Sequence, residues 1–395
     1  MKRSTDRILS THTGSLPRPQ ALAAAIVEHD RGTLAAVEEA SLRLQIREAV
    51  ESTVLKQLRS GLDVINDGEA SKIGYATYVR ERLSGFEGKG RGLTIWDLHD
   101  VPEFAQRSLA GLDPMVPACT GPIVYQGRAA LEEDIANLKA ATEKVEPADV
   151  FMTAASPGVI SIYLENQHYP SSEEYWQAIA EAMRVEYEAI AEAGFVLQID
   201  APDLAMGRHV GTELLDLEEF RRQVAVRVEL LNHACRNIPT EKIRLHLCWG
   251  NYLGPHHHDV PLSDLVDILL RCKAGALSFE AANPRHQHEW RVWDEVKLPD
   301  DKILIPGVID TCSSYVEHPE IVAERIVRFA DLVGRERVIA GTDCGFANFA
   351  SYQIVDPKIA WMKLAALAEG AALGSHRLWN TSRRESPARQ AGAAA

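Results

Sequence analysis

Two residues spaced as His-x-Cys, His246 and Cys248, could together bind a metal ion. They lie in the strand-like run IRLHLC, and side chains two positions apart on a strand point to the same face. Glu280 ends the apolar run ALSF, where a carboxylate needs a partner, and Cys344 follows the run RVIAGTD. Imidazole, thiolate and carboxylate together suit zinc, which binds such ligands tetrahedrally. The spacing leaves a second interpretation open: both cysteines are small buried apolar residues and Glu280 is a buried ion-pair partner.

These four residues stand at the ends of predicted strands. Short β-rich runs alternate with longer amphipathic runs along the chain, a pattern that favours a parallel sheet wrapped by helices. One helical run, 171–194, opens with serines and acidic residues and closes at Gly194, as helix capping prefers. The predicted strands cover residues 10–14, 63–67, 149–154, 195–200, 243–248, 276–280, 302–310 and 337–343. Eight strands predict an α/β fold of the (β/α)8 TIM-barrel type.

Polar residues follow nearly every predicted strand. In a barrel, the C-terminal ends of the strands meet around one mouth, where active sites of this fold lie. We therefore expect side chains far apart in the sequence to meet there: Asp67, Glu69, Asp200, His246, Cys248, Glu280, Asp310, Cys312, Asp343 and Cys344.

The chain contains no internal repeat or long linker, so we expect one domain over residues 1–380. Residues 84–125, which include GFEGKGRG and several prolines, break the alternation and predict an insertion after the second strand. The Ala/Gly-rich residues 381–395 are expected to form a flexible tail.

The composition bears on partners and location. A formal charge of −14 disfavours nucleic-acid binding, which needs a concentrated basic surface. No apolar run is long enough to span a membrane and the N-terminus lacks the pattern of a signal peptide, so a cytoplasmic protein with six reduced cysteines is expected. The negative charge fits a small-molecule ligand better than a nucleic acid. Whether the protein forms a homo-oligomer is left open.

Seven motifs in order resemble the catalytic barrel of cobalamin-independent methionine synthases: THTGSLPRP, GLDVINDGEASK, LQIDAPDLAM, HLCWGN, LSFEAANPRH, IPGVIDTCSS and GTDCGF. The resemblance runs from residue 11 to about residue 350. It implies a barrel of the uroporphyrinogen decarboxylase and methionine synthase type. It also implies a Zn²⁺ ion bound by His246, Cys248, Glu280 and Cys344, which activates a small-molecule thiol, homocysteine or a similar one, toward a methyl or alkyl donor.

The resemblance also implies substrate-binding residues. Ser15, Glu69 and Asp200 match residues that hold the amino-acid part of homocysteine, with the carboxylates facing its ammonium group. The alternatives are a turn serine at Ser15 and carboxylates that only cap strand ends at the other two positions.

Departures from the family affect the donor. We expect the family's amino-terminal, folate-binding half to be missing. Small residues, Ala154 and Ala155, stand where the family has a tryptophan that stacks on the pterin. Cys312 stands at the position of a proton-donating histidine, which leaves Asp310 and Cys312 as catalytic candidates.

Three other functions stay open. An epoxyalkane:coenzyme M transferase-type enzyme would add a thiol to an epoxide, and its sulfonate-bearing acceptor would need cationic residues. A uroporphyrinogen decarboxylase-like lyase would need no metal, and a carrier would use the four ligands as a closed structural zinc site. The cationic candidates for a sulfonate are Arg18, Lys72, Arg208 and Arg285.

Two histidine clusters are ambiguous. The run GPHHHDV, with His256–His258, could form a second metal site, but a polar loop is favoured because one loop cannot easily aim three consecutive histidines at one ion. His286 and His288 follow Glu280 closely enough to support a metal ligand or contact a substrate.

Overall fold

Eight parallel strands form the centre of the molecule. The computed structural model describes residues 1–108 and 117–380. The strand order is β1-β13-β12-β11-β10-β8-β6-β2, and the backbone N–H of Asp63 donates to the carbonyl of Ser10 over 3.1 Å, which joins the first two strands and closes the barrel. The predicted TIM barrel and its eight strands are thus confirmed. Their bounds are β1 Leu9–Ser10, β2 Val64–Ile65, β6 Asp149–Ala155, β8 Val196–Asp200, β10 Ile243–His246, β11 Ala276–Phe279, β12 Ile303–Ile309 and β13 Ile339–Thr342.

The barrel interior is filled near the strand starts. One buried cluster there consists of Leu9, Val64, Phe151, Val196, Ala276, Ile303, Ile305 and Ile339. Strand β10 contributes a charged residue instead: the Arg244 guanidinium lies 3.9 Å from the ring centroid of Phe151 and donates to the carbonyl of His12 over 2.7 Å. This packing closes one end of the barrel, so open space lies at the other end.

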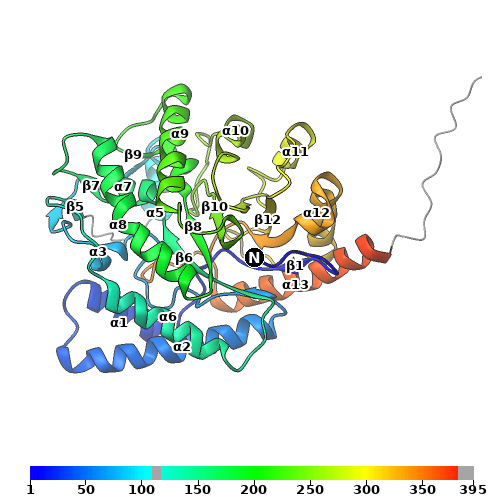
Figure 1. Ribbon diagram of the computed structural model, residues 1–395, viewed down its shortest axis with the longest axis horizontal. Helices are drawn as coiled ribbons and strands as arrows, with labels where there is room; N and C mark the ends of the chain where they lie inside the picture. Colours follow the sequence, from blue (N-terminus) through cyan, green and yellow to red (C-terminus); the bar gives the residue numbers. More distant parts are fainter. Residues whose placement is uncertain (109–116, 381–395) are drawn as a thin grey trace, which may run out of the picture.

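Helices surround the strands (Figure 1). Helix α8, Ser172–Glu192, begins after the Ser171 side chain, which accepts from the N–H of Glu174, and is followed by Gly194 with φ of +99°. Both capping predictions for this helix are confirmed. The other helices of four or more residues in the described part are α1 Gln20–Asp30, α2 Glu39–Arg59, α3 Val79–Arg82, α4 Trp96–His99, α5 Pro102–Ser108, α6 Arg128–Thr142, α7 Pro157–Tyr163, α9 Leu217–Ala234, α10 Val266–Leu269, α11 Val292–Glu295, α12 Pro319–Val333 and α13 Pro357–Asn380.

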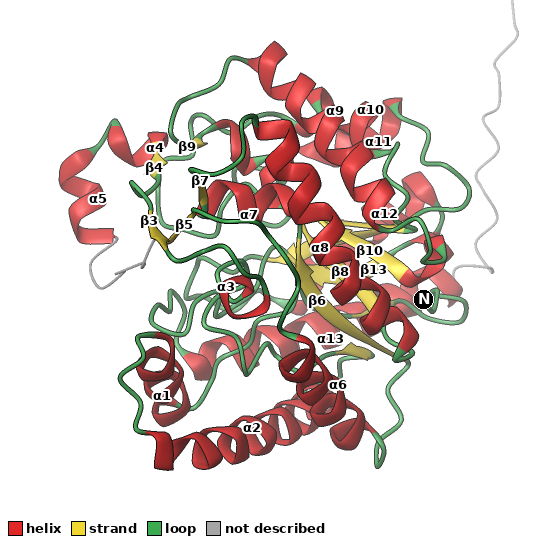
Figure 2. Cartoon of the chain, turned by 60° about the vertical axis from the view of Figure 1, so that its left-hand side comes forward, coloured by secondary structure: helices red, strands yellow, loops and turns green. Residues whose placement is uncertain are grey.

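The predicted insertion lies outside the barrel (Figure 2). It contains β3 Gly88–Lys89, β4 Thr94–Ile95, α4, α5 and β5 Pro117–Cys119. Strand β3 pairs with β5, and β5 pairs with β7, Glu165–Asn166, which follows barrel strand β6. Strand β4 pairs with β9, Val210–Gly211, which follows barrel strand β8. The insertion is therefore attached to the loops beyond the C-terminal ends of the strands, beside the barrel mouth.

No helix within the described ranges combines the length and the apolar character needed to cross a bilayer. The predicted flexible tail, 381–395, lies outside the described residues.

Candidate metal and substrate site

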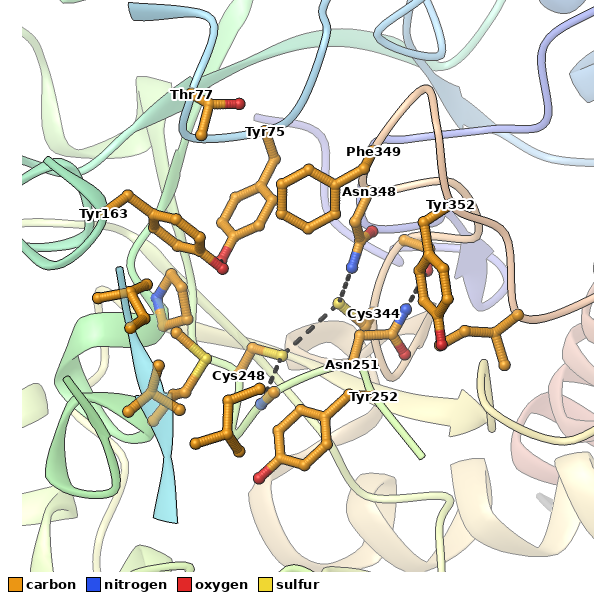
Figure 3. A pocket seen from close by; sticks show the side chains of 18 of the residues that line it. Tyr75, Thr77, Tyr163, Cys248, Asn251, Tyr252, Cys344, Asn348, Phe349 and Tyr352 are labelled. Carbon is orange, nitrogen blue, oxygen red and sulfur yellow. Dashed lines mark hydrogen bonds between the residues drawn. The ribbon is translucent and has the colours of Figure 1, made fainter. Parts of the chain in front are cut away.

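The ends of the barrel strands surround a cavity of about 950 Å³. His246 ends β10, Asp200 ends β8, and Cys344 follows β13 by two residues. Together with Cys248, these side chains line the cavity. Figure 3 shows Cys248 and Cys344 side by side in it. The barrel thus brings together residues that are spread over most of the sequence, as the strand-end pattern predicts.

Three of the predicted metal ligands form a compact group. The ligand atoms of His246, Cys248 and Cys344 all lie within 4.8 Å of one another. The two Sγ atoms are 3.6 Å apart. Zinc–sulfur bonds of about 2.3 Å in a tetrahedral site place two thiolates about 3.8 Å apart, so the pair matches the spacing of two ligands of one zinc ion.

The His246 imidazole also fits a metal. The residue is buried, and neither ring nitrogen has a hydrogen-bond partner. Burial, assisted by the Arg244 charge, lowers the pKa of His246 to about 3, so the ring is neutral and offers a lone pair. A buried imidazole without a partner is costly, and a bound cation would remove that cost.

The thiols of Cys248 and Cys344 form a hydrogen bond with each other. A hydrogen bond to Cys344 and burial raise the pKa of Cys248 well above its ordinary value. A metal ion has to displace the thiol proton, because the thiolate is the ligand form.

Glu280, the predicted fourth ligand, lies beside this group but is not among the atoms within 4.8 Å of one another. Its Oε1 atom is 3.3 Å from Cys248 Sγ and accepts from the N–H of Trp249 over 2.8 Å. Its Oε2 atom accepts from Asn283 and Arg285, each over 2.7 Å. The carboxylate therefore contacts the Cys248 thiol through one oxygen and forms an ion pair with Arg285 through the other.

The three predicted amino-acid-binding residues line the same cavity. Glu69 Oε1 accepts from Thr153 over 2.9 Å, whereas its Oε2 atom is buried without a partner. Burial and the neighbouring Glu69 carboxylate raise the pKa of Asp200 well above its ordinary value. Ser15 Oγ donates to Asn348 Oδ1 over 2.8 Å. Two buried carboxylates facing one cavity form a local environment that favours a cationic ligand.

None of the four predicted cationic residues lines the cavity, and two of them, Arg18 and Lys72, lie behind its wall. Arg18 donates to the carbonyls of Glu69, Lys72 and Ala347. Lys72 Nζ donates to Thr153, and lies 4.3 Å from the ring centroid of Tyr78. Arg18 contacts the backbone of Glu69, which lines the cavity. Lys72 contacts Thr153, whose hydroxyl donates to the Glu69 carboxylate.

Asp310 and Cys312 also lie outside the cavity lining. Asp310 Oδ1 accepts from the N–H of Cys312 over 2.9 Å, and Cys312 Sγ donates to Asn251 Oδ1 over 3.0 Å. Asn251 lines the cavity and donates to the carbonyl of Gly345 over 3.0 Å. Burial raises the pKa of Cys312 well above its ordinary value, so the thiol is protonated, and its hydrogen bond to Asn251 links it to the cavity lining.

An aromatic wall was not predicted from the sequence. The rings of Tyr75, Tyr163 and Phe349 pack against one another with centroids 5.7 to 6.2 Å apart, and Tyr352 extends the wall (Figure 3). The rings come from loops after β2 and β13 and from the end of α7. Without the fold, no local pattern marks these aromatic residues as neighbours.

The three consecutive histidines divide into two kinds. His257 and His258 each contact Asp100 over 2.9 Å at the surface, as expected for a polar loop. His256 is buried and contacts Asp259. It therefore differs from the favoured prediction that all three histidines belong to a polar loop.

Comparisons with known proteins identify relatives of this chain. A methionine synthase from Thermococcus kodakarensis is 25% identical over 362 residues, 91% of this chain and 91% of that protein. A 2-hydroxypropyl-CoM lyase from Xanthobacter autotrophicus is 26% identical over 366 residues, 85% of this chain and 86% of that protein. A solved B12-independent methionine synthase from a Shewanella species, in complex with selenomethionine, has the same fold, with a TM-score of 0.73, 19% identity and coverage of 94% and 99%.

A family described as the catalytic domain of cobalamin-independent synthases matches residues 160–368, more than half of the chain. The matched segment contains His246, Cys248, Glu280 and Cys344, and the methionine synthase resemblance predicted from the seven motifs is confirmed. The chain therefore belongs to the cobalamin-independent methionine synthase family of enzymes.

Proposed function

We propose that the protein is a zinc-dependent thiol S-methyltransferase whose acceptor is homocysteine or a similar amine-bearing thiol. The observation that carries this proposal is the grouping of His246, Cys248 and Cys344 within 4.8 Å at a cavity of about 950 Å³. These three ligands leave a fourth position on a tetrahedral zinc ion for Glu280 or for a substrate sulfur. When bound, zinc would hold the acceptor thiol as a nucleophilic thiolate at neutral pH.

The carboxylates support an acceptor with an ammonium group. Glu69 Oε2 is buried without a partner, and Glu69 and Asp200 both line the cavity. An ammonium group placed between them would receive charge-assisted hydrogen bonds and offset the cost of burying two carboxylates. Ser15 would contact the other end of the amino-acid group.

The two other enzyme activities require cations at the same place. Neither Arg nor Lys is among the described residues that line the cavity. The sulfonate of coenzyme M and the carboxylates of a uroporphyrinogen-type substrate would both lack a charged partner there. The similarity to a 2-hydroxypropyl-CoM lyase therefore supports shared thiol chemistry better than a shared acceptor.

The methyl donor is assigned to the aromatic side of the cavity. Tyr75, Tyr163, Phe349 and Tyr352 provide faces and edges against which a flat donor could pack. We assign Asp310 and Cys312 the role of positioning Asn251, which separates Cys312 from the cavity. Residues 1–380 are proposed to act as one domain.

Zinc content followed by X-ray absorption at the zinc edge tests the proposal. Homocysteine should add one sulfur to the zinc environment, whereas coenzyme M, which lacks the amine, should add sulfur only at much higher concentration. The Cys248→Ser variant supplies the background from zinc bound elsewhere. An unchanged spectrum with every thiol would favour a closed structural site, and preferential binding of coenzyme M would favour epoxide chemistry.

A further inference from the structure

A second group of metal-ligand side chains lies beside the insertion. Asp97 belongs to α4, His209 follows β8, and His256 and Asp259 lie in the loop after β10. Their ligand atoms lie within 4.8 Å of one another. The side chains of Asp97 and His209 are fully buried, and those of His256 and Asp259 are 1% and 8% exposed. Three separate segments thus place two carboxylates and two imidazoles in one buried space.

The distances within this group match tetrahedral coordination. His209 Nε2 lies 3.5 Å from Asp97 Oδ2 and 3.5 Å from Asp259 Oδ1. His256 Nδ1 lies 3.2 Å from the same Asp259 oxygen. Zinc bound to nitrogen and carboxylate oxygen at about 2.0 to 2.2 Å would separate adjacent ligand atoms by about 3.3 to 3.6 Å.

One of the two imidazoles, that of His209, lacks the partners that a buried ring normally has. Neither ring nitrogen of His209 makes a hydrogen bond, although the ring lies near the Trp249 backbone. The His256 ring has two partners: Nε2 donates to the carbonyl of Tyr252 over 3.1 Å, and Nδ1 lies 3.2 Å from Asp259 Oδ1. A cation bound between Asp97 and Asp259 would give the His209 ring a partner and would offset the cost of burying two carboxylates.

The outer contacts resemble those that orient metal ligands. The His256 ring donates to a backbone carbonyl, the Tyr252 hydroxyl donates to Asp97 over 2.7 Å, and His286 contacts Asp259 over 3.0 Å. Such second contacts fix ring and carboxylate orientation at metal sites.

We propose that Asp97, His209, His256 and Asp259 bind a divalent transition-metal ion, zinc by preference, as a structural site that ties the insertion to the barrel. Four protein ligands close the site, so it exchanges none of them for substrate. Leu98 and His99 on the same helix, and Tyr252 between the ligand segments, line the main cavity. The ion would therefore hold one wall of that cavity in place. This proposal does not depend on the proposed methyl transfer.

Metal analysis of the full chain with Cys248→Ser and Cys344→Ser tests the second site without the first. We expect this variant to keep about one zinc ion per chain, and cobalt(II) substituted for zinc to show nitrogen and oxygen ligands without thiolate charge-transfer absorption. Adding His209→Gln should weaken metal binding by roughly 100-fold or more and make residues 84–108 more sensitive to protease.

The exposed neighbour His257 provides the matched control. His257→Gln changes the same residue type, and we expect it to keep the ion. Loss of metal with His257→Gln but not with His209→Gln would place the ion on Asp97, His257 and His258 instead and overturn the proposal. A folded Cys248→Ser, Cys344→Ser chain that binds neither zinc nor cobalt at micromolar concentration would overturn it as well. Where His209→Gln does not fold, Asp259→Asn is tested in its place.

Discussion

Arg285 Nη2 lies 2.7 Å from Glu280 Oε2, and the guanidinium therefore holds the carboxylate that is predicted to complete the metal site. The other oxygen of Glu280 lies 3.3 Å from Cys248 Sγ. A small rotation of the Glu280 carboxylate would exchange its ion pair with Arg285 for a metal–oxygen bond. Asn283, which donates to the same Oε2 atom, limits that rotation further.

Arg285→Met should weaken metal binding at the cysteine site by about 10- to 100-fold, the usual cost of removing a group that orients a metal ligand. Arg285 also lies 3.4 Å from Asp259. The cysteine site is therefore followed by the thiolate charge-transfer absorption of bound cobalt(II), to which Asp259 cannot contribute. Arg291→Met, at an exposed position of the same segment, is the control. An affinity equal to that of the unmodified protein would show that Glu280 needs no support from Arg285.

Cys248→Ser or Cys344→Ser should each remove the metal from the cavity and lower thiol methylation by more than about 100-fold, because each deletes one of the grouped ligands. Circular dichroism should show that the fold is retained. Cys235→Ser makes the same substitution at a buried cysteine outside the cavity and should keep both metal and activity. Full activity in a metal-free Cys248→Ser protein would remove the metal from the mechanism.

The strand ends could be predicted from sequence because each barrel strand is a short apolar run that stops at a polar residue. His246 and Cys344 were placed in this way, and the fold brings their ligand atoms together. The orientation of Glu280 could not be predicted, since it depends on hydrogen bonds from Asn283 and Arg285 in a loop whose conformation the sequence pattern does not encode.

Two further features depend on contacts between distant segments. Tyr75 and Phe349 become neighbours only when β2 and β13 lie in one barrel. His256 was grouped with its sequence neighbours, but its buried contact is with Asp259, near His209 and Asp97. His256 has a positive φ of +52°, a backbone conformation that no sequence periodicity predicts.

Glu69→Gln should raise the KM for homocysteine by roughly 10- to 100-fold, because a hydrogen bond to a charged group contributes about 1.5 to 3 kcal/mol. A thiol of similar length without the amine should lose much less, and kcat for homocysteine should change little. Steady-state kinetics with both thiols measure the difference. Glutamine keeps the length of the side chain and its contact with Thr153. Equal losses for the two thiols would contradict amine recognition by this residue.

His12 should make the fold sensitive to acid. Its Nε2 atom lies 2.7 Å from Gln57 Oε1, and its Nδ1 atom accepts from the N–H of Gly14 over 3.2 Å, so two contacts fix a neutral ring. Burial lowers the pKa of His12 from its ordinary value of 6.5 to about 3. Between these two values the unfolded chain binds a proton that the folded chain does not, and the free energy of unfolding therefore falls as pH decreases below 6.5.

At pH 5 this single group should lower the free energy of unfolding by about 2 kcal/mol relative to neutral pH. Denaturant unfolding of metal-loaded protein at pH 7 and pH 5 measures the change. His12→Gln can keep a contact with Gln57 but cannot titrate, so its own decrease over this interval should be smaller by about 2 kcal/mol, whatever its stability at pH 7. His376→Gln, at an exposed position on α13, should leave the decrease unchanged. The same pH dependence in the His12 variant would mean that other groups, and not this imidazole, take up the proton.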